Sequence, residues 1–245
     1  MQTWDEIRQW RKAQRAELIA RRTAAPAEER RRWGDAITRT LVEEFPILQW
    51  MTVGFYWPIQ GEFDPRFAIR EFRRHGAKAA LPVVVQKSAP LQFREWWPGV
   101  AVTSGVFGLP VPEGSATLRP QAVLVPPVGF DRQGYRLGYG GGYFDRTLAA
   151  AAPQPLKIGV GYELSRMATI HPQPHDVPMD FVVTEAGIHR AAAGGLERIT
   201  EPGEAAELAE EIMREREQAC GGGGEASGAP DYASPACYLH ELDRK

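Results

Sequence analysis

Short apolar runs alternate with longer polar or amphipathic stretches along the first 190 residues. Runs of this kind, bounded by Gly, Pro or charged residues, are typical of buried strands. We expect strands at 51–56, 79–85, 91–96, 122–125, 158–161 and 181–184. We expect helices at 3–22, 26–44, 64–76 and from about 142 to 148. Strands that alternate with helices predict an α/β fold: a largely parallel sheet flanked by helices, in a single domain with a C-terminal extension.

Capping residues support the two expected N-terminal helices. Thr3-Trp-Asp-Glu6 has the form of a capping box, and Pro26 is a favourable residue at the start of the second helix. Glu62 and the glycine-rich segment after residue 125 each follow an expected strand. Ligands in parallel sheets bind at the carboxyl ends of strands, so these two features can meet there.

The segment 125–146 is the most distinctive part of the chain, because glycines and charged residues are interleaved in it. Glycines let backbone N–H groups approach an anion, and a helix N-terminus favours negative charge. The segment is therefore interpreted as a phosphate-handling loop. It lacks the Lys-Ser/Thr of a Walker A loop, and Tyr143 replaces the last glycine of a dinucleotide fingerprint. A turn that serves only chain geometry is the alternative on pattern alone.

Composition limits the classes of function. The 245 residues carry a net charge of −2, so no overall basic field recruits nucleic acid. Both cysteines, Cys220 and Cys237, lie near the C-terminus, and no apolar run suggests a signal sequence or a membrane span. We expect a soluble, cytoplasmic monomer with an α/β domain at 1–195. A helical segment, a Gly-rich linker and a flexible tail are expected at 196–245.

Four stretches carry a resemblance to a known family. They are Tyr56-Trp-Pro-Ile-Gln-Gly-Glu-Phe-Asp64, Gly108-Leu-Pro-Val-Pro112, Arg136-Leu-Gly-Tyr-Gly-Gly-Gly-Tyr-Phe-Asp-Arg146 and His175-Asp-Val-Pro-Met-Asp180. In this order they closely resemble the signature of 5-formyltetrahydrofolate cyclo-ligases, also called methenyltetrahydrofolate synthetases. The resemblance covers about residues 5 to 190, and the ordered set is far more specific than any one stretch.

The resemblance implies an ATP-driven ring closure with magnesium. The formyl oxygen on N5 of the folate attacks the γ-phosphate, N10 closes the ring, and phosphate leaves. The expected partner is 5-formyltetrahydrofolate, with or without a polyglutamate tail, and neither nucleic acid nor membrane. Positioning, magnesium and cationic side chains should supply most of the catalysis.

The resemblance also implies roles for single residues. Arg136 matches the catalytic arginine, and Lys12 and Arg15 are our choices for phosphate contacts from the first helix. Asp145 and Asp176 match acids associated with magnesium; the alternatives are a carboxylate at a helix N-terminus and a turn residue. The stretch that matches the nucleotide loop comprises Arg136, Leu137, Gly138, Tyr139, Gly140, Gly141, Gly142, Tyr143 and Phe144.

Two residues are expected to contact the folate. Glu62 matches the glutamate that contacts the pterin in the family. A carboxylate suits this role, since it accepts hydrogen bonds from the donor-rich edge of the pterin. Trp57 is chosen for stacking on the pterin, with apolar packing as the alternative.

The chain departs from the family where some members carry basic residues, at Tyr139 and Gly141. A relative that binds folate or nucleotide with little cyclo-ligase activity is therefore an alternative. RNA binding through the arginine-rich first helix is a weaker one, since no RNA-binding motif is present.

Overall fold

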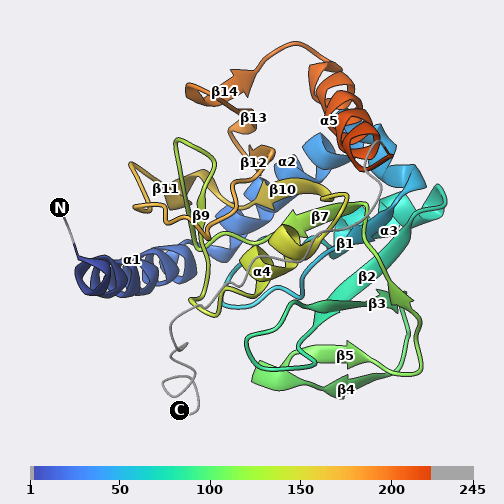
Figure 1. Cartoon of the computed structure of the whole chain (residues 1–245), viewed down its shortest axis with the longest axis horizontal. Helices are drawn as coiled ribbons and strands as arrows, with labels where there is room; N and C mark the ends of the chain where they lie inside the picture. Colours follow the sequence, from blue (N-terminus) through green and yellow to red (C-terminus); the bar gives the residue numbers. More distant parts are fainter. Residues whose placement is uncertain (1–2, 222–245) are drawn as a thin grey trace.

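The computed structural model describes residues 3–221, and in this part of the chain nine strands form one twisted sheet (Figure 1). Its order is β14-β13-β12-β10-β7-β1-β2-β3-β6. The five central strands are parallel: β12 (Phe181–Thr184), β10 (Leu156–Val160), β7 (Ala122–Val125), β1 (Thr52–Gly54) and β2 (Lys78–Val83). The antiparallel edge strands are β13 (Gly187–Ala192), β14 (Gly195–Ile199), β3 (Gln92–Trp96) and β6 (Thr117–Leu118). The expected α/β fold with a largely parallel sheet is confirmed.

Helices cover both faces of the sheet. The N-terminal helix α1 (Trp4–Ala24) is followed by α2 (Ala27–Glu44) and α3 (Arg66–Arg74), and α5 (Glu204–Gly221) ends the described part. The main core contains side chains of α2, α3 and α5, whereas α4 (Tyr143–Ala150) packs in a second cluster on the opposite face. Because both faces are covered, β7 is buried along its whole length, as its continuous apolar sequence predicts.

Helix starts agree closely with the sequence signals. The capping box at Thr3 is formed, with the Thr3 Oγ1 accepting from the Glu6 N–H and the Glu6 carboxylate accepting from the Thr3 N–H. Pro26 stands one residue before α2, and Gly142 immediately precedes α4. Strand ends were less predictable. β1 is shorter than the apolar run 51–56, and the apolar residues Phe55 and Tyr56 are buried beyond the end of the strand.

The glycine-rich segment is not one long loop, and that expectation was wrong. Its first half forms a hairpin of β8 (Gly129–Asp131) and β9 (Arg136–Leu137), and β11 (Arg166–Met167) pairs with β8. Helix α1 packs directly on this hairpin. A Cβ atom on Gly129 would lie 2.6 Å from Leu18 Cδ1, so only glycine permits this approach.

A second hairpin and three 3₁₀ helices complete the described elements. The hairpin pairs β4 (Val102–Ser104) with β5 (Pro110–Pro112). The 3₁₀ helices are η1 (Pro46–Trp50), η2 (Val106–Gly108) and η3 (Glu163–Ser165).

Helix α5, beyond the α/β pattern that the sequence predicts, belongs to the same core. Ala205 and Ala209 are fully buried in the main cluster. Arg216 donates to both carboxylate oxygens of Asp180, at 2.6 and 2.9 Å, and the buried Lys157 ammonium lies 3.1 Å from the same carboxylate. The expected linker and tail at 222–245, including Cys237, lie outside the described residues. No helix among the described residues is long and apolar enough to span a membrane.

The burial of α5 gives a stability prediction. Replacing Ala209 by Gln forces a larger polar side chain into a packed site, which should lower the free energy of unfolding by about 2–4 kcal/mol. Urea denaturation measures the change, and Glu210→Gln on the exposed side of α5 is the matched control. Equal stability of the two variants would show that α5 is not docked on the core.

Candidate active site

The candidate site is built around Arg136, at the start of β9 and next to the N-terminus of α4. The Arg136 side chain is only 3% exposed. Its Nη1 donates to Asp145 Oδ1 at 3.0 Å and to the Val177 carbonyl at 3.1 Å. The same Asp145 oxygen accepts from the Val177 N–H at 3.1 Å. One ion pair thus joins the hairpin, the first turn of α4 and the segment before β12.

Two arginines hold the glycine turn between β9 and α4. Arg15 Nε, from α1, donates to the Gly138 carbonyl at 2.7 Å. Arg146 Nη2, from α4, donates to the Gly141 carbonyl at 2.5 Å. Gly140 has a φ of +96°, and a Cβ atom there would lie 3.4 Å from Arg15 Cζ. The turn therefore needs glycine at this position for its backbone conformation.

Neither of these two arginines forms an ion pair with a carboxylate of residues 3–221, although the Asp176 charge acts on Arg15 from a longer distance. Both Nη groups of Arg15 lack a hydrogen-bond acceptor among residues 3–221, and the buried Nε of Arg146 also has none. Burial and the nearby Arg11 charge lower the pKa of Arg15 to about 10, so it stays charged at neutral pH. Two cations flanking a glycine turn at a helix N-terminus form an anion-binding arrangement.

Asp176 lies beside the same turn but is paired with a different arginine. Arg11 Nη2 lies 2.5 Å from Asp176 Oδ2, and both side chains are 8% exposed. Asp176 Oδ2 also accepts from the Gln173 N–H at 2.7 Å. Arg11 donates further to the carbonyls of Ile170 and His171, both at 2.9 Å. This network anchors α1 to the 170–176 segment.

Glu62 is closed off by the glycine turn. Its Oε1 accepts from the Tyr139 hydroxyl at 2.7 Å, and its Oε2 accepts from the Ile59 N–H at 2.9 Å. Arg22 Nη2 donates to the Tyr139 hydroxyl at 2.8 Å and lies 3.8 Å from Glu62 Oε1. The side chains of Arg22 and Glu62 are each 3% exposed. The structure therefore brings Glu62 and the glycine turn together, as the strand order predicts.

The remaining predicted residues occupy different environments. Leu137 is buried and packs with Leu18, so its side chain is part of a core cluster. Phe144 packs against the second core cluster, and Arg146 lies over Tyr143. Lys12 is exposed on α1, three residues before Arg15.

Trp57 packs against the main core, and the Arg66 guanidinium lies 4.3 Å from its ring centroid. One face of the indole is therefore covered by a cation. A stacked pterin would have to use the other face.

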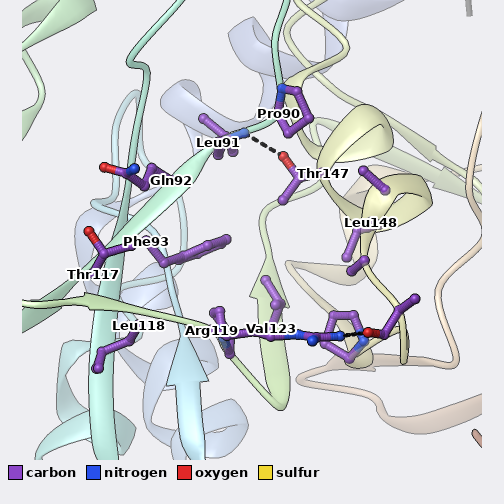
Figure 2. A pocket seen from close by; sticks show the side chains of 15 residues that line it. Pro90, Leu91, Gln92, Phe93, Thr117, Leu118, Arg119, Val123, Thr147 and Leu148 are labelled. Carbon is purple, nitrogen blue, oxygen red and sulfur yellow. Dashed lines mark hydrogen bonds between the residues drawn. The ribbon is translucent and has the colours of Figure 1, made fainter. Parts of the chain in front are cut away.

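An apolar pocket of about 400 Å³ lies elsewhere, between α4 and strands β3, β6 and β7 (Figure 2). Leu91, Phe93 and Val123 line it, and the Leu91 N–H donates to Thr147 Oγ1. None of the predicted site residues lines this pocket. Two of the predicted residues, Glu62 and Tyr139, instead contact each other, and the Glu62 carboxylate is buried.

The two acids expected to bind magnesium differ in their free oxygens. Both oxygens of Asp176 are engaged by Arg11, whereas Asp145 Oδ2 accepts no hydrogen bond from the described residues. Asp145 is also the more exposed, at 19% against 8%. Within residues 3–221 no three His, Cys, Asp or Glu side chains are grouped to hold a metal. Magnesium often keeps its waters and binds one or two carboxylates plus phosphates, so Asp145 alone fits such an ion.

Sequence reasoning missed Arg11 and Arg22 as parts of this site. Both stand in an N-terminal helix crowded with basic residues, and their spacing does not distinguish them from exposed neighbours. One signal was available: they are separated by about three turns, so they project from the same face as Leu18, which is an apolar residue.

The burial of Glu62 gives a prediction on pH. Burial raises the pKa of Glu62 above its ordinary value of 4.5, against the opposing effects of its hydrogen bonds and Arg22. The folded protein favours the protonated Glu62. This contribution to the free energy of unfolding is fully present below the pKa that Glu62 has in the unfolded chain, and it is lost as the pH rises through the raised pKa of the folded protein. Relative to Glu62→Gln, the parent should lose up to about 1.4 kcal/mol of unfolding free energy per pH unit in that window.

Urea denaturation of the parent and of Glu62→Gln, from about pH 4 to about pH 8, measures this difference. Glu28→Gln, an exposed site on α2, is the control and should show no such trend. A constant difference between parent and Glu62→Gln across the range would contradict the raised pKa.

Comparisons with known proteins agree with one another. The family model described as "5-formyltetrahydrofolate cyclo-ligase family" matches residues 7–185. The 5-formyltetrahydrofolate cyclo-ligase of Mycolicibacterium smegmatis is 36% identical over 142 residues, which are 54% of this chain and 73% of that protein. The Escherichia coli cyclo-ligase is 27% identical over 177 residues, 69% of this chain and 96% of that protein.

Solved structures give the same result. The NMR structure of Aquifex aeolicus 5,10-methenyltetrahydrofolate synthetase has a TM-score of 0.66 at 28% identity, covering 78% of this chain and 96% of that one. The Mycoplasma pneumoniae synthetase, at 23% identity and a TM-score of 0.58, shares the fold, with 71% of this chain and 98% of that one covered. Because the family model spans most of the chain, the chain belongs to the 5-formyltetrahydrofolate cyclo-ligase family.

Proposed function

We propose that the protein converts 5-formyltetrahydrofolate and ATP to 5,10-methenyltetrahydrofolate, ADP and phosphate, at the site around Arg136. Membership of the cyclo-ligase family supports the reaction. The observation that carries the assignment to this site is the pair of arginines, Arg15 and Arg146, that clasp the glycine turn without a carboxylate partner.

The nucleotide phosphates bind at the glycine turn. Arg15 and Arg146 direct one N–H each to a carbonyl of the turn and keep other donors for phosphate oxygens. The first N–H groups of α4 have no partner within the helix and add a favourable dipole. The charges of these two arginines replace the basic side chains that some relatives carry at the positions of Tyr139 and Gly141.

The reaction is a phosphoryl transfer followed by ring closure. The formyl oxygen on N5 attacks the γ-phosphorus, and the bond to the ADP oxygen breaks. N10 then attacks the activated formyl carbon and loses its proton. The C–O bond breaks last, and phosphate carries away the former formyl oxygen. The protein's task is to position two anionic substrates and to stabilise the charge on the transferring group.

Arg136 is suited to the transferring phosphoryl group. Its Nη1 is occupied by Asp145 and Val177, which fixes the plane of the guanidinium. Its Nε and Nη2 donate to no described atom. The side chain is 3% exposed, so these donors reach phosphate oxygens only when the segments that cover them move on substrate binding. A fixed cation aimed at developing charge costs little reorganisation during the reaction.

Magnesium, when bound with the nucleotide, would neutralise phosphate charge. Asp145 would hold it through the free Oδ2, directly or through water, while Oδ1 stays with Arg136. Asp176 serves to anchor Arg11 and so to place α1 next to the turn. Glu62 accepts the N–H edge of the pterin. The cytoplasmic location, the monomeric state and the absence of nucleic-acid binding stay predictions from the sequence.

The first test concerns Arg136. Arg136→Met should lower the turnover number by at least about 100-fold, a loss of roughly 2.7 kcal/mol of transition-state stabilisation. The absorbance of the methenyl product reports turnover, and calorimetry should show a much smaller change in folate affinity. The control is Arg132→Met, an exposed arginine of the same hairpin. A folded Arg136→Met enzyme with normal turnover would remove Arg136 from the mechanism.

The second test concerns Arg15, one of the two arginines that hold the glycine turn. Arg15→Met should raise the KM for ATP about 10- to 100-fold, because a charge-assisted hydrogen bond contributes roughly 1.5–3 kcal/mol. The KM for folate should change much less. The control is Gln14→Met, the preceding residue of α1. An unchanged KM for ATP would place the phosphates elsewhere.

A further inference from the structure

The Tyr139 hydroxyl is the central member of a directed hydrogen-bond chain. Arg22 Nη2 donates to the hydroxyl at 2.8 Å, and the hydroxyl donates to Glu62 Oε1 at 2.7 Å. Arg22 is itself fixed by the carbonyls of Gln60 and Pro127, at 3.1 and 3.3 Å. The chain therefore joins α1, the loop after β1 and the glycine turn through a single side chain of the turn.

Tyr139 also covers the carboxylate of Glu62, to which the pterin is proposed to bind. The Glu62 side chain is 3% exposed while Tyr139 bonds to it, so a ligand edge cannot reach its oxygens in this arrangement. The Ile59 N–H occupies the other carboxylate oxygen. A pterin that presents two N–H groups needs the position of the Tyr139 hydroxyl. The phenol is the partner that can leave, because it is a side chain flanked by glycines, whereas the Ile59 N–H belongs to the backbone of the loop that carries Glu62.

Side-chain hydrogen bonds from neighbouring elements tether the glycine turn. Arg15 holds Gly138, Arg146 holds Gly141, and Tyr139 ties the turn to Glu62. Glycines flank Tyr139 on both sides, which lets the backbone rotate at either side of it. Loss of the bond between Tyr139 and Glu62 would untie the turn from the folate site and leave the bonds from Arg15 and Arg146 in place.

We propose that Tyr139 occupies the pterin-binding carboxylate in the substrate-free enzyme, and that folate displaces it and thereby frees the glycine turn for the nucleotide. The inference rests on the proposed function and extends it, because it makes Tyr139 a positioning residue of the folate site that links the two substrates. Binding of either substrate then favours the other, and by thermodynamic linkage the factor is the same in both directions.

The exchange replaces one hydrogen-bond donor to the buried Glu62 carboxylate by another. Desolvation raises the pKa of Tyr139, so at neutral pH the phenol is protonated and acts as a donor to Glu62. A pterin N–H is also a donor, so the exchange replaces one hydrogen bond by another of the same kind. The buried carboxylate is satisfied in both states, which keeps the two states close in free energy.

The experiment measures folate binding by calorimetry with and without a non-hydrolysable ATP analogue. In the parent we expect the analogue to tighten 5-formyltetrahydrofolate binding by at least about fivefold. Tyr139→Phe removes the competing hydroxyl and leaves Glu62 without its donor. Without nucleotide, this variant should bind folate at least about fivefold more tightly than the parent, and the effect of the analogue should fall below about twofold.

The matched control is Tyr135→Phe, which removes a hydroxyl from the adjoining β8–β9 hairpin without removing a bond to Glu62. It should behave as the parent does. Tyr139→Leu should repeat the result of Tyr139→Phe and guards against poor folding of one variant, which circular dichroism would reveal. No residue without a hydroxyl at position 139 should restore the coupling between folate and nucleotide binding.

Two kinds of failure are distinguishable. If the parent binds no folate and forms no methenyl product, the proposed function and this inference both fall. If the parent turns over normally while Tyr139→Phe keeps the same coupling, or binds folate more weakly than the parent, only the inference is overturned. Weaker binding would mean that the Tyr139 hydroxyl is a fixed part of the folate site.

Discussion

The site depends on arginine side chains holding the carbonyl groups of one glycine turn. Arg15 reaches the turn from α1 and Arg146 reaches it from α4, each through a short bond to a turn carbonyl. A turn so rich in glycine has little conformational preference of its own, and fixing it costs conformational entropy. The arginines supply the order that the backbone lacks, and they leave positive charge where we propose that the triphosphate binds.

Charge balance around the turn divides the arginines into two groups. Arg11 and Arg136 are each paired with an aspartate, so they position segments and add little net charge. Arg15 and Arg146 are not paired with a carboxylate among the described residues, so they supply the field for an anion. The positive charge that we propose for phosphate binding thus comes from two helices, because Tyr139 and Gly141 carry none on the turn itself.

The parts of the fold that local chemistry determines were predictable from the sequence. The capping box at Thr3 and the apolar run of β7 each predict one structure, and both are found. The hairpin of β8 and β9 was missed, because its glycines indicate turns and its strands are too short to show alternation. The inward role of Arg22 was equally hidden, since it depends on the fold that brings Glu62 to it.

The docking of α5 shows a different limit. Its Ala205 and Ala209 give a weak hydrophobic signal, and small residues are buried here because the helix approaches the core closely. The ion pair from Arg216 to Asp180 joins positions 36 residues apart, which no local pattern contains. By contrast, the meeting of Glu62 with the glycine turn follows from strand order, and the sequence predicts it.

The central claim is that the site transfers a phosphoryl group to the formyl oxygen of the folate. Isotope transfer tests it most directly: 5-formyltetrahydrofolate labelled with ¹⁸O in the formyl group is converted with ATP, and the released phosphate is analysed by mass spectrometry. Each released phosphate should contain one ¹⁸O atom, because the C–O bond breaks with the oxygen bound to phosphorus. Release of the label into water, with unlabelled phosphate, would contradict it.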